Sequence, residues 1–108
     1  MSIDHVKRAR DAWPILVRLA RSGGEPMTYG QLCARMGLHH RAAGYFLGVI
    51  QRYCARKKLP ALQALAVNKR TGIPGAGYAG ARAQKSHAKE VERVRAHTWA
   101  LLAPRFDE

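Results

Sequence analysis

Apolar side chains recur every three or four residues in four stretches of the chain, which is the spacing of a buried helical face. Between the third and fourth stretches the pattern changes to a weak alternation, followed by Gly- and Pro-rich residues. The pattern therefore predicts a mainly α-helical chain with a short β segment before its last helix. The helices are expected over residues 4–21, 28–37, 40–57 and 86–102.

Capping and breaking residues refine the first two helices. Ser2 or Asp4 can accept the free N–H groups at the start of the first helix, and Thr28 those of the second. Pro14 lies inside the first helix and has no N–H to donate. We therefore expect the first helix to kink or split near Ala12.

The β segment follows a pair of helices that are separated by a glycine-containing turn. A strand is expected over residues 62–68, a turn over 68–72 and a return arm over 73–78. Two such helices followed by a strand pair is the order of a winged helix-turn-helix. The predicted fold is therefore mainly α with a small β wing, as a single domain over residues 1–108.

Charge is distributed unevenly along the chain. There are 19 Lys and Arg against 7 Asp and Glu, a formal net charge of +12, and no carboxylate lies in residues 26–89. Such a positive field attracts polyanions, and DNA gains from the counterions that are released on binding. Double-stranded DNA is the expected partner, with RNA or an acidic protein as alternatives. A metal-dependent nuclease is not expected, because it needs clustered carboxylates to hold magnesium.

Several function classes are excluded by simple counts. No apolar run reaches 18 residues and the N-terminus is charged from Asp4, so neither a membrane span nor a secretory signal is expected. Cys33 and Cys54 are too few for a disulfide scaffold, and their helix positions predict buried, inert thiols. Trp13 and Trp99 are expected to join the first and last helices. We expect a cytoplasmic protein, associated with the nucleoid if it binds DNA.

The third helix is the expected recognition helix, because its N-terminal end is basic and otherwise short-chained. His39, His40 and Arg41 are expected to face the DNA groove. Adjacent histidines at one helix start point apart, so no metal ion or other cofactor is predicted. Contacts to phosphates are expected from Tyr29, Arg35, Arg52, Lys69 and Arg70.

Several short motifs occur in an order that a known family shares. Residues 24–32 read Gly-Glu-Pro-Met-Thr-Tyr-Gly-Gln-Leu and residues 41–44 read Arg-Ala-Ala-Gly. Leu59-Pro60 and the glycines of residues 72–80 follow. Together they resemble the DNA-binding domain of alkylguanine DNA alkyltransferases and alkyltransferase-like proteins, over about residues 12–80. Those proteins have Gly-x-Val-x-Thr/Ser-Tyr-x-x-Leu-Ala, then Arg-Ala-Val-Gly, a proline turn and a glycine-containing wing.

The resemblance implies specific roles for two residues. In that family the tyrosine lies by the phosphate of a flipped nucleotide and the arginine replaces the extruded base, and these roles fall on Tyr29 and Arg41. The alternative is that Tyr29 packs at a helix start and Arg41 contacts a phosphate. The alkyl-acceptor motif Pro-Cys-His-Arg corresponds to residues 63–66, which puts Ala64 or a neighbour at the cysteine position. Without a thiolate, alkyl transfer is not expected.

The sequence therefore predicts a non-catalytic protein that binds double-stranded DNA, in regulation or in the response to DNA damage. Two alternatives stay open. One is a metal-free nuclease or toxin in which His39 or His40 acts with Lys69 near a phosphate, as general acid and base. The other is a basic adaptor that binds an acidic protein.

Overall fold

The computed structural model describes residues 4–75 and 84–106. Its helices and its small two-stranded parallel sheet confirm the mainly helical class. Among these residues no helix combines the length and the apolar character that a membrane crossing requires. The elements are, in order, α1 (His5–Ser22), β1 (Met27–Thr28), α2 (Tyr29–Arg35), the 3-10 turn η1 (His40–Ala42), α3 (Ala43–Arg56), the 3-10 turn η2 (Leu62–Leu65), β2 (Ala66–Val67) and α4 (Gln84–Ala96).

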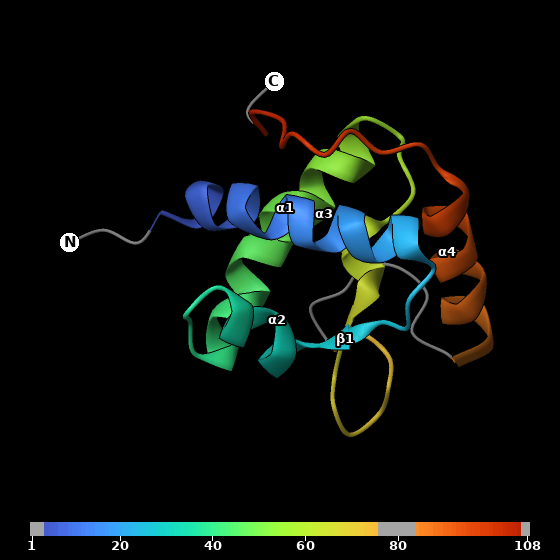
Figure 1. Cartoon of the computed structure of the whole chain (residues 1–108), viewed down its shortest axis with the longest axis horizontal. Coiled ribbons are helices and arrows are strands. Elements are labelled where there is room, and N and C mark those ends of the chain that lie inside the picture. Colours follow the sequence, from blue (N-terminus) through green and yellow to red (C-terminus); the bar gives the residue numbers. More distant parts are fainter. Residues whose placement is uncertain (1–3, 76–83, 107–108) are drawn as a thin grey trace.

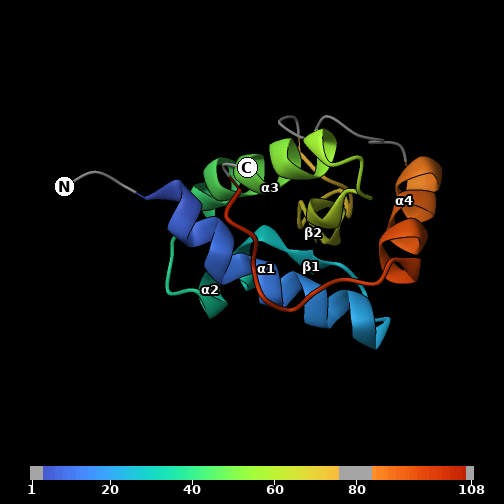
Figure 2. The same ribbon diagram turned by 90° about the horizontal axis from the view of Figure 1, so that it is seen from above.

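Two helices form the body of the molecule. Figure 1 shows α1 lying across α3, with β1 below α1 leading into α2 and with α4 at the far end. Seen from above, α1 and α3 occupy separate layers, and η2 and β2 lie between them and α4 (Figure 2). After α4 the chain returns over α1 towards α3. The inner faces of α1 and α3 are therefore covered, while Arg41, Tyr45 and Arg52 on the other side of α3 are exposed among the described residues.

α1 is one continuous helix through Pro14, so the expected split near Ala12 is wrong. The helix begins where it was expected, because Asp4 Oδ1 accepts the N–H of Lys7 at 2.9 Å. Pro14 removes only the hydrogen bond to the carbonyl of Arg10. Both residues border an open depression. The loss of this one bond does not end the helix, which continues to Ser22.

α2 begins with the expected cap. Thr28 Oγ1 accepts the N–H of Gln31 at 3.0 Å, and Gln31 Oε1 accepts the N–H of Thr28 at 2.9 Å. This reciprocal pair satisfies two of the free donors at the helix start. The helix expected over residues 40–57 is divided into η1 and α3. The N–H of Ala42 donates to the carbonyl of His39 at 3.0 Å, a three-residue bond that tightens this turn.

The strand expected over residues 62–68 is mostly wrong. Leu62–Leu65 is the turn η2, and only Ala66–Val67 is extended. All four η2 residues are buried and η2 contacts three helices, so it has no solvent face that would favour alternation. β2 pairs with β1 in parallel, Met27 opposite Ala66, and forms no hairpin within the described residues. Part of the expected return arm, residues 76–78, lies outside the described residues.

An aromatic cluster lies in the core, and it includes the predicted contact between Trp13 and Trp99, although Trp99 does not belong to the last helix. Their rings meet edge to face at 5.6 Å, and Trp13 also contacts Tyr53 of α3 and Phe106. The Nε1–H of Trp13 donates to the carbonyl of Ala100 at 2.9 Å. The last helix ends earlier than expected, at Ala96, so Trp99 belongs to the segment that returns over α1.

The end of α3 contains a strained position that mutation can relieve. Lys58 has φ +55°, a left-handed conformation that costs a residue with a Cβ roughly 1 kcal/mol. We expect Lys58→Gly to raise the free energy of unfolding by about 0.5–1 kcal/mol in chemical denaturation. Lys57 has φ −90° and serves as the control, since Lys57→Gly is expected to lower the same quantity. An equal effect of both substitutions would contradict this explanation.

Candidate nucleic-acid interface

The outer surface of α3 and η1 carries a row of residues at helical spacing. We call these residues the α3 face: Arg41, Gly44, Tyr45, Gly48 and Arg52. Its two arginines and its tyrosine are exposed, and nothing lies within 4 Å of a Cβ built on Gly44. A Cβ on Gly48 would meet only the Arg52 guanidinium, at 3.4 Å. The opposite side of α3 holds the predicted apolar stripe of Ala43, Phe46, Leu47, Ile50 and Cys54, all buried.

From the sequence, Tyr45 is only one of several tyrosines able to stack on bases, and neither Tyr45 nor Gly48 is predicted as part of this surface. Tyr45 is 64% exposed, and its ring stacks on that of His5 at 5.0 Å. Counting in steps of three or four from Arg41 to Arg52 passes through both positions, so the helical spacing was the signal that could have found them.

The predicted groove residues His39, His40 and Arg41 lie together at the start of η1, and all three are exposed. His39 caps η1, because its Nδ1 accepts the N–H of Arg41 at 3.2 Å. The centroids of the two imidazole rings are 4.2 Å apart, so the expectation that these adjacent histidines point apart is wrong. No group of three or more His, Cys, Asp or Glu side chains within residues 4–75 and 84–106 is placed to hold a metal ion.

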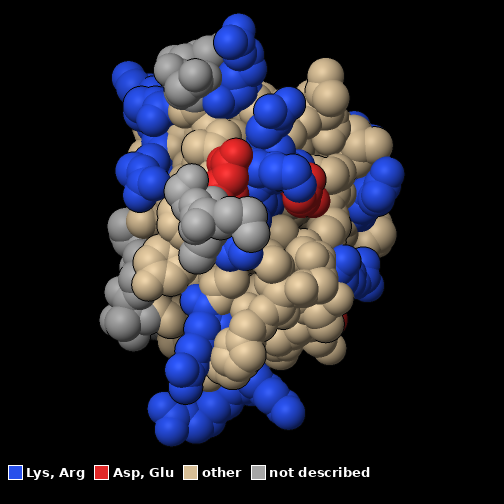
Figure 3. All heavy atoms as spheres, turned by 90° about the vertical axis from the view of Figure 1, so that its left-hand side faces the viewer, with Lys and Arg blue, Asp and Glu red and all other residues tan. Residues whose placement is uncertain are grey.

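Lys69 and Arg70 are exposed on a loop that follows β2. The N–H of Asn68 donates to the carbonyl of Ile73 at 2.9 Å, and that of Gly72 to the carbonyl of Asn68 at 2.8 Å, which closes the loop. The loop projects at the bottom of Figure 1. At the same height Figure 3 shows Lys and Arg gathered, while the acidic side chains in that view lie mainly near its centre.

Tyr29 joins the loop to the start of α2. Its hydroxyl accepts the N–H of Gly75 at 2.7 Å, and its ring is half-buried. No acceptor within the described part of the chain takes the hydroxyl hydrogen, so Tyr29 can still donate to an outside group such as a phosphate. The structure therefore brings Tyr29 together with the loop that carries Lys69 and Arg70.

Arg35 is placed apart from the other predicted residues. It lies on the side of α2 that faces α1, where it lines two adjoining depressions. None of the other predicted phosphate or groove residues lines either depression. Arg18 lies across one of them, on α1, and was not singled out from the sequence.

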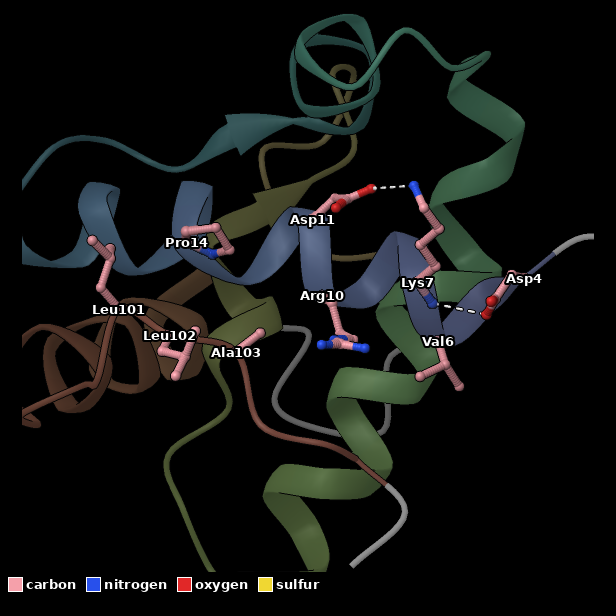
Figure 4. A pocket seen from close by; sticks show the side chains of 9 residues that line it. All are labelled: Asp4, Val6, Lys7, Arg10, Asp11, Pro14, Leu101, Leu102 and Ala103. Carbon is pink, nitrogen blue, oxygen red and sulfur yellow. Dashed lines mark hydrogen bonds and ion pairs between the residues drawn. The ribbon is translucent and has the colours of Figure 1, made fainter.

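Another depression, of about 550 Å³, lies between the first half of α1 and residues 101–103 (Figure 4). Lys7 is paired with Asp11 at 3.5 Å, and Asp4 caps the helix. The two carboxylates balance Lys7 and Arg10, so this depression has no net charge to attract a polyanion.

The positions that correspond to the alkyl-acceptor motif are closed. Gln63, Ala64, Leu65 and Ala66 are all buried, and the carbonyl of Ala64 accepts a hydrogen bond from His87 Nε2 at 2.7 Å. Cys33 and Cys54 are buried too, as expected. Desolvation by burial raises the pKa of both thiols, which favours the unreactive protonated form.

Comparison with protein-family models, with curated proteins and with solved structures found no match to this chain. The resemblance to the alkyltransferase domain therefore rests on the motifs quoted above.

The hydroxyl of Tyr29 supports a direct test of how the loop is anchored. Tyr29→Phe removes the acceptor of the Gly75 N–H, and we expect the free energy of unfolding to fall by about 1 kcal/mol in chemical denaturation. Amide exchange at Gly75 is expected to accelerate. Tyr53→Phe is the matched control, since no hydrogen bond of the Tyr53 hydroxyl is found among the described residues. If the two substitutions have the same effect, the Tyr29 bond does not anchor the loop.

Proposed function

We propose that this protein binds double-stranded DNA without catalysis, in the manner of a winged helix-turn-helix. In this proposal the α3 face meets a DNA groove, and the loop of Lys69 and Arg70 meets the backbone. The observation that carries the proposal is the unneutralised charge of residues 26–89, in which Arg41 and Arg52 lie exposed on one helical face.

The ion pairs of the protein support this reading. The two pairs found in the described residues are Lys7–Asp11 and Arg93–Glu90, and both lie outside residues 26–89. Within the described residues, no carboxylate pairs with any of four cations of the proposed interface: Arg41, Arg52, Lys69 and Arg70. Each such cation can neutralise a DNA phosphate and release a condensed counterion.

The glycines of the α3 face add a steric argument. An exposed glycine inside a helix costs about 1 kcal/mol relative to alanine, and no neighbouring atom in the fold requires Gly44. Its missing side chain lets another molecule approach the helix backbone closely. Arg41 and Arg52 flank this opening, as positioning contacts to phosphates would.

In this proposal α2, the turn after it and α3 serve as the helix-turn-helix. The loop that Tyr29 anchors serves as the wing. Within this proposal two roles remain open for Arg41. It either contacts a phosphate or fills the space of an extruded base, as the alkyltransferase resemblance implies. A duplex that carries one alkylated guanine distinguishes the two roles. The protein binds that duplex more tightly than the plain duplex only if Arg41 replaces an extruded base.

Loss of a phosphate contact has a defined signature in salt dependence. Fluorescence anisotropy of a labelled duplex is expected to give weaker binding for Arg41→Ala and Arg52→Ala, with the slope of log K against log salt reduced by about 0.9 for each lost contact. Arg93→Ala removes the same charge from α4, where Arg93 is paired with Glu90, and is expected to leave the slope unchanged.

Equal slopes for all three variants, or no duplex binding at low salt, would overturn the proposed interface. The same samples, incubated with EDTA and run on a denaturing gel, test the metal-free nuclease. Cleavage that is abolished by His39→Ala or His40→Ala would replace the non-catalytic proposal.

The open position at Gly44 gives a second, steric test. Gly44→Leu is expected to reduce duplex affinity at least tenfold while the thermal midpoint stays the same or rises, because leucine favours helix and its Cβ would have no described atom within 4 Å. Ala88→Leu places the same side chain at an exposed position of α4 and is expected to leave duplex affinity unchanged. Unchanged affinity for Gly44→Leu would contradict close approach of DNA to α3.

A further inference from the structure

A groove runs between α1 and α2, on a side of the molecule that the proposed DNA contacts do not use. Its two parts have volumes of about 320 and 500 Å³ and share Leu19, Met27 and Arg35. α1 lines it with one helical stripe and α2 with another, each at spacings of three and four residues. The stripes are Ile15, Arg18, Leu19 and Ser22 from α1, and Gln31, Ala34 and Arg35 from α2.

The floor of the groove is apolar and preformed. Met27 of β1 is only 6% exposed, and Ile15 and Leu19 are half-buried beside it. A Cβ on Gly24 would lie 2.8 Å from Leu19 Cδ1, so the absence of a side chain at Gly24 lets Leu19 occupy its place. An apolar side chain of a partner would therefore find a floor that needs little rearrangement.

The rim of the groove is cationic at one end. Arg18 and Arg35 are exposed, and neither donates to a carboxylate or a carbonyl within the described part of the chain. Glu25 borders the other end, and no other carboxylate lines the groove. Carboxylates of a ligand would therefore be drawn to the Arg18–Arg35 end and kept from the Glu25 end.

We propose that this groove docks an acidic peptide segment of a protein partner, with a large apolar side chain on the Leu19–Met27 floor and carboxylates against Arg18 and Arg35. The phosphate backbone of DNA has no apolar group that would fill the apolar floor, which argues against DNA as the occupant of this groove. A second copy of the chain is disfavoured because both copies carry a net charge of +12. The depression of Figure 4 lacks this complementarity, since its carboxylates balance its cations.

The test selects ligands by their chemistry from a display library of random 12-residue peptides, with the intact protein at physiological salt. Enriched peptides are expected to contain a large apolar residue flanked by Asp or Glu. Their affinities are then measured for wild type, for Arg18→Ala with Arg35→Ala, and for Lys69→Ala with Arg70→Ala, which removes the same charge elsewhere. Circular dichroism confirms that both double variants are folded.

The proposal expects the Arg18 and Arg35 variant to bind the peptides at least tenfold more weakly, and the charge-matched variant to change less than threefold. For the DNA duplex the reverse is expected: the Lys69 and Arg70 variant binds it more weakly, and the Arg18 and Arg35 variant binds it about as well as wild type. Failure to enrich any such peptide, or equal weakening by both variants, overturns the docking site. If the Arg18 and Arg35 variant instead binds the duplex more weakly, the groove is part of the DNA-binding surface. The docking proposal is then wrong, while the proposed DNA binding stands. Peptide binding without any duplex binding would overturn only the proposed function.

Discussion

The indole of Trp13 joins the three parts of the chain that make up the body of the molecule. Its ring packs against Tyr53 of α3 and against Trp99 and Phe106 of the C-terminal segment, and its N–H donates to the carbonyl of Ala100. The buried side of α3 is thereby fixed against α1. On the outer side of α3 the described part of α1 contacts Tyr45 through His5, while Arg41 and Arg52 stay exposed and open to a ligand.

Two groups of arginines differ in their partners, and the difference helps to explain how so basic a chain folds. One group donates to backbone carbonyls: Arg21 to Trp99 at 2.6 Å, Arg95 to Gly24 at 2.7 Å and Arg56 to Phe106. These arginines hold the C-terminal segment and the α1–β1 connection without needing carboxylates. The other group, on the α3 face and beside the α1–α2 groove, has no such partner in the described residues. Its charge remains available for binding.

The sequence predicted the helices because caps and spacing act locally, as at Asp4 and Thr28. It failed at Pro14, where the loss of one hydrogen bond does not split the helix, and at Leu62–Leu65, where burial by three helices favours a turn over a strand. The parallel pairing of β1 with β2 depends on residues far apart in the chain, so no local pattern contained it. Likewise, helical spacing placed Arg41 and Arg52 correctly at the surface. The position of Arg35 beside α1 follows only from tertiary packing.

Backbone amide chemical shifts during titration with a short duplex test the central claim most directly, since they locate the contact surface residue by residue. We expect the largest changes in amide chemical shift at residues 39–52 and at residues 68–75, with little change along the α1–α2 groove or on α4. Changes centred on Arg18 and Arg35, or shifts that stay constant up to saturating duplex at low salt, would contradict the claim.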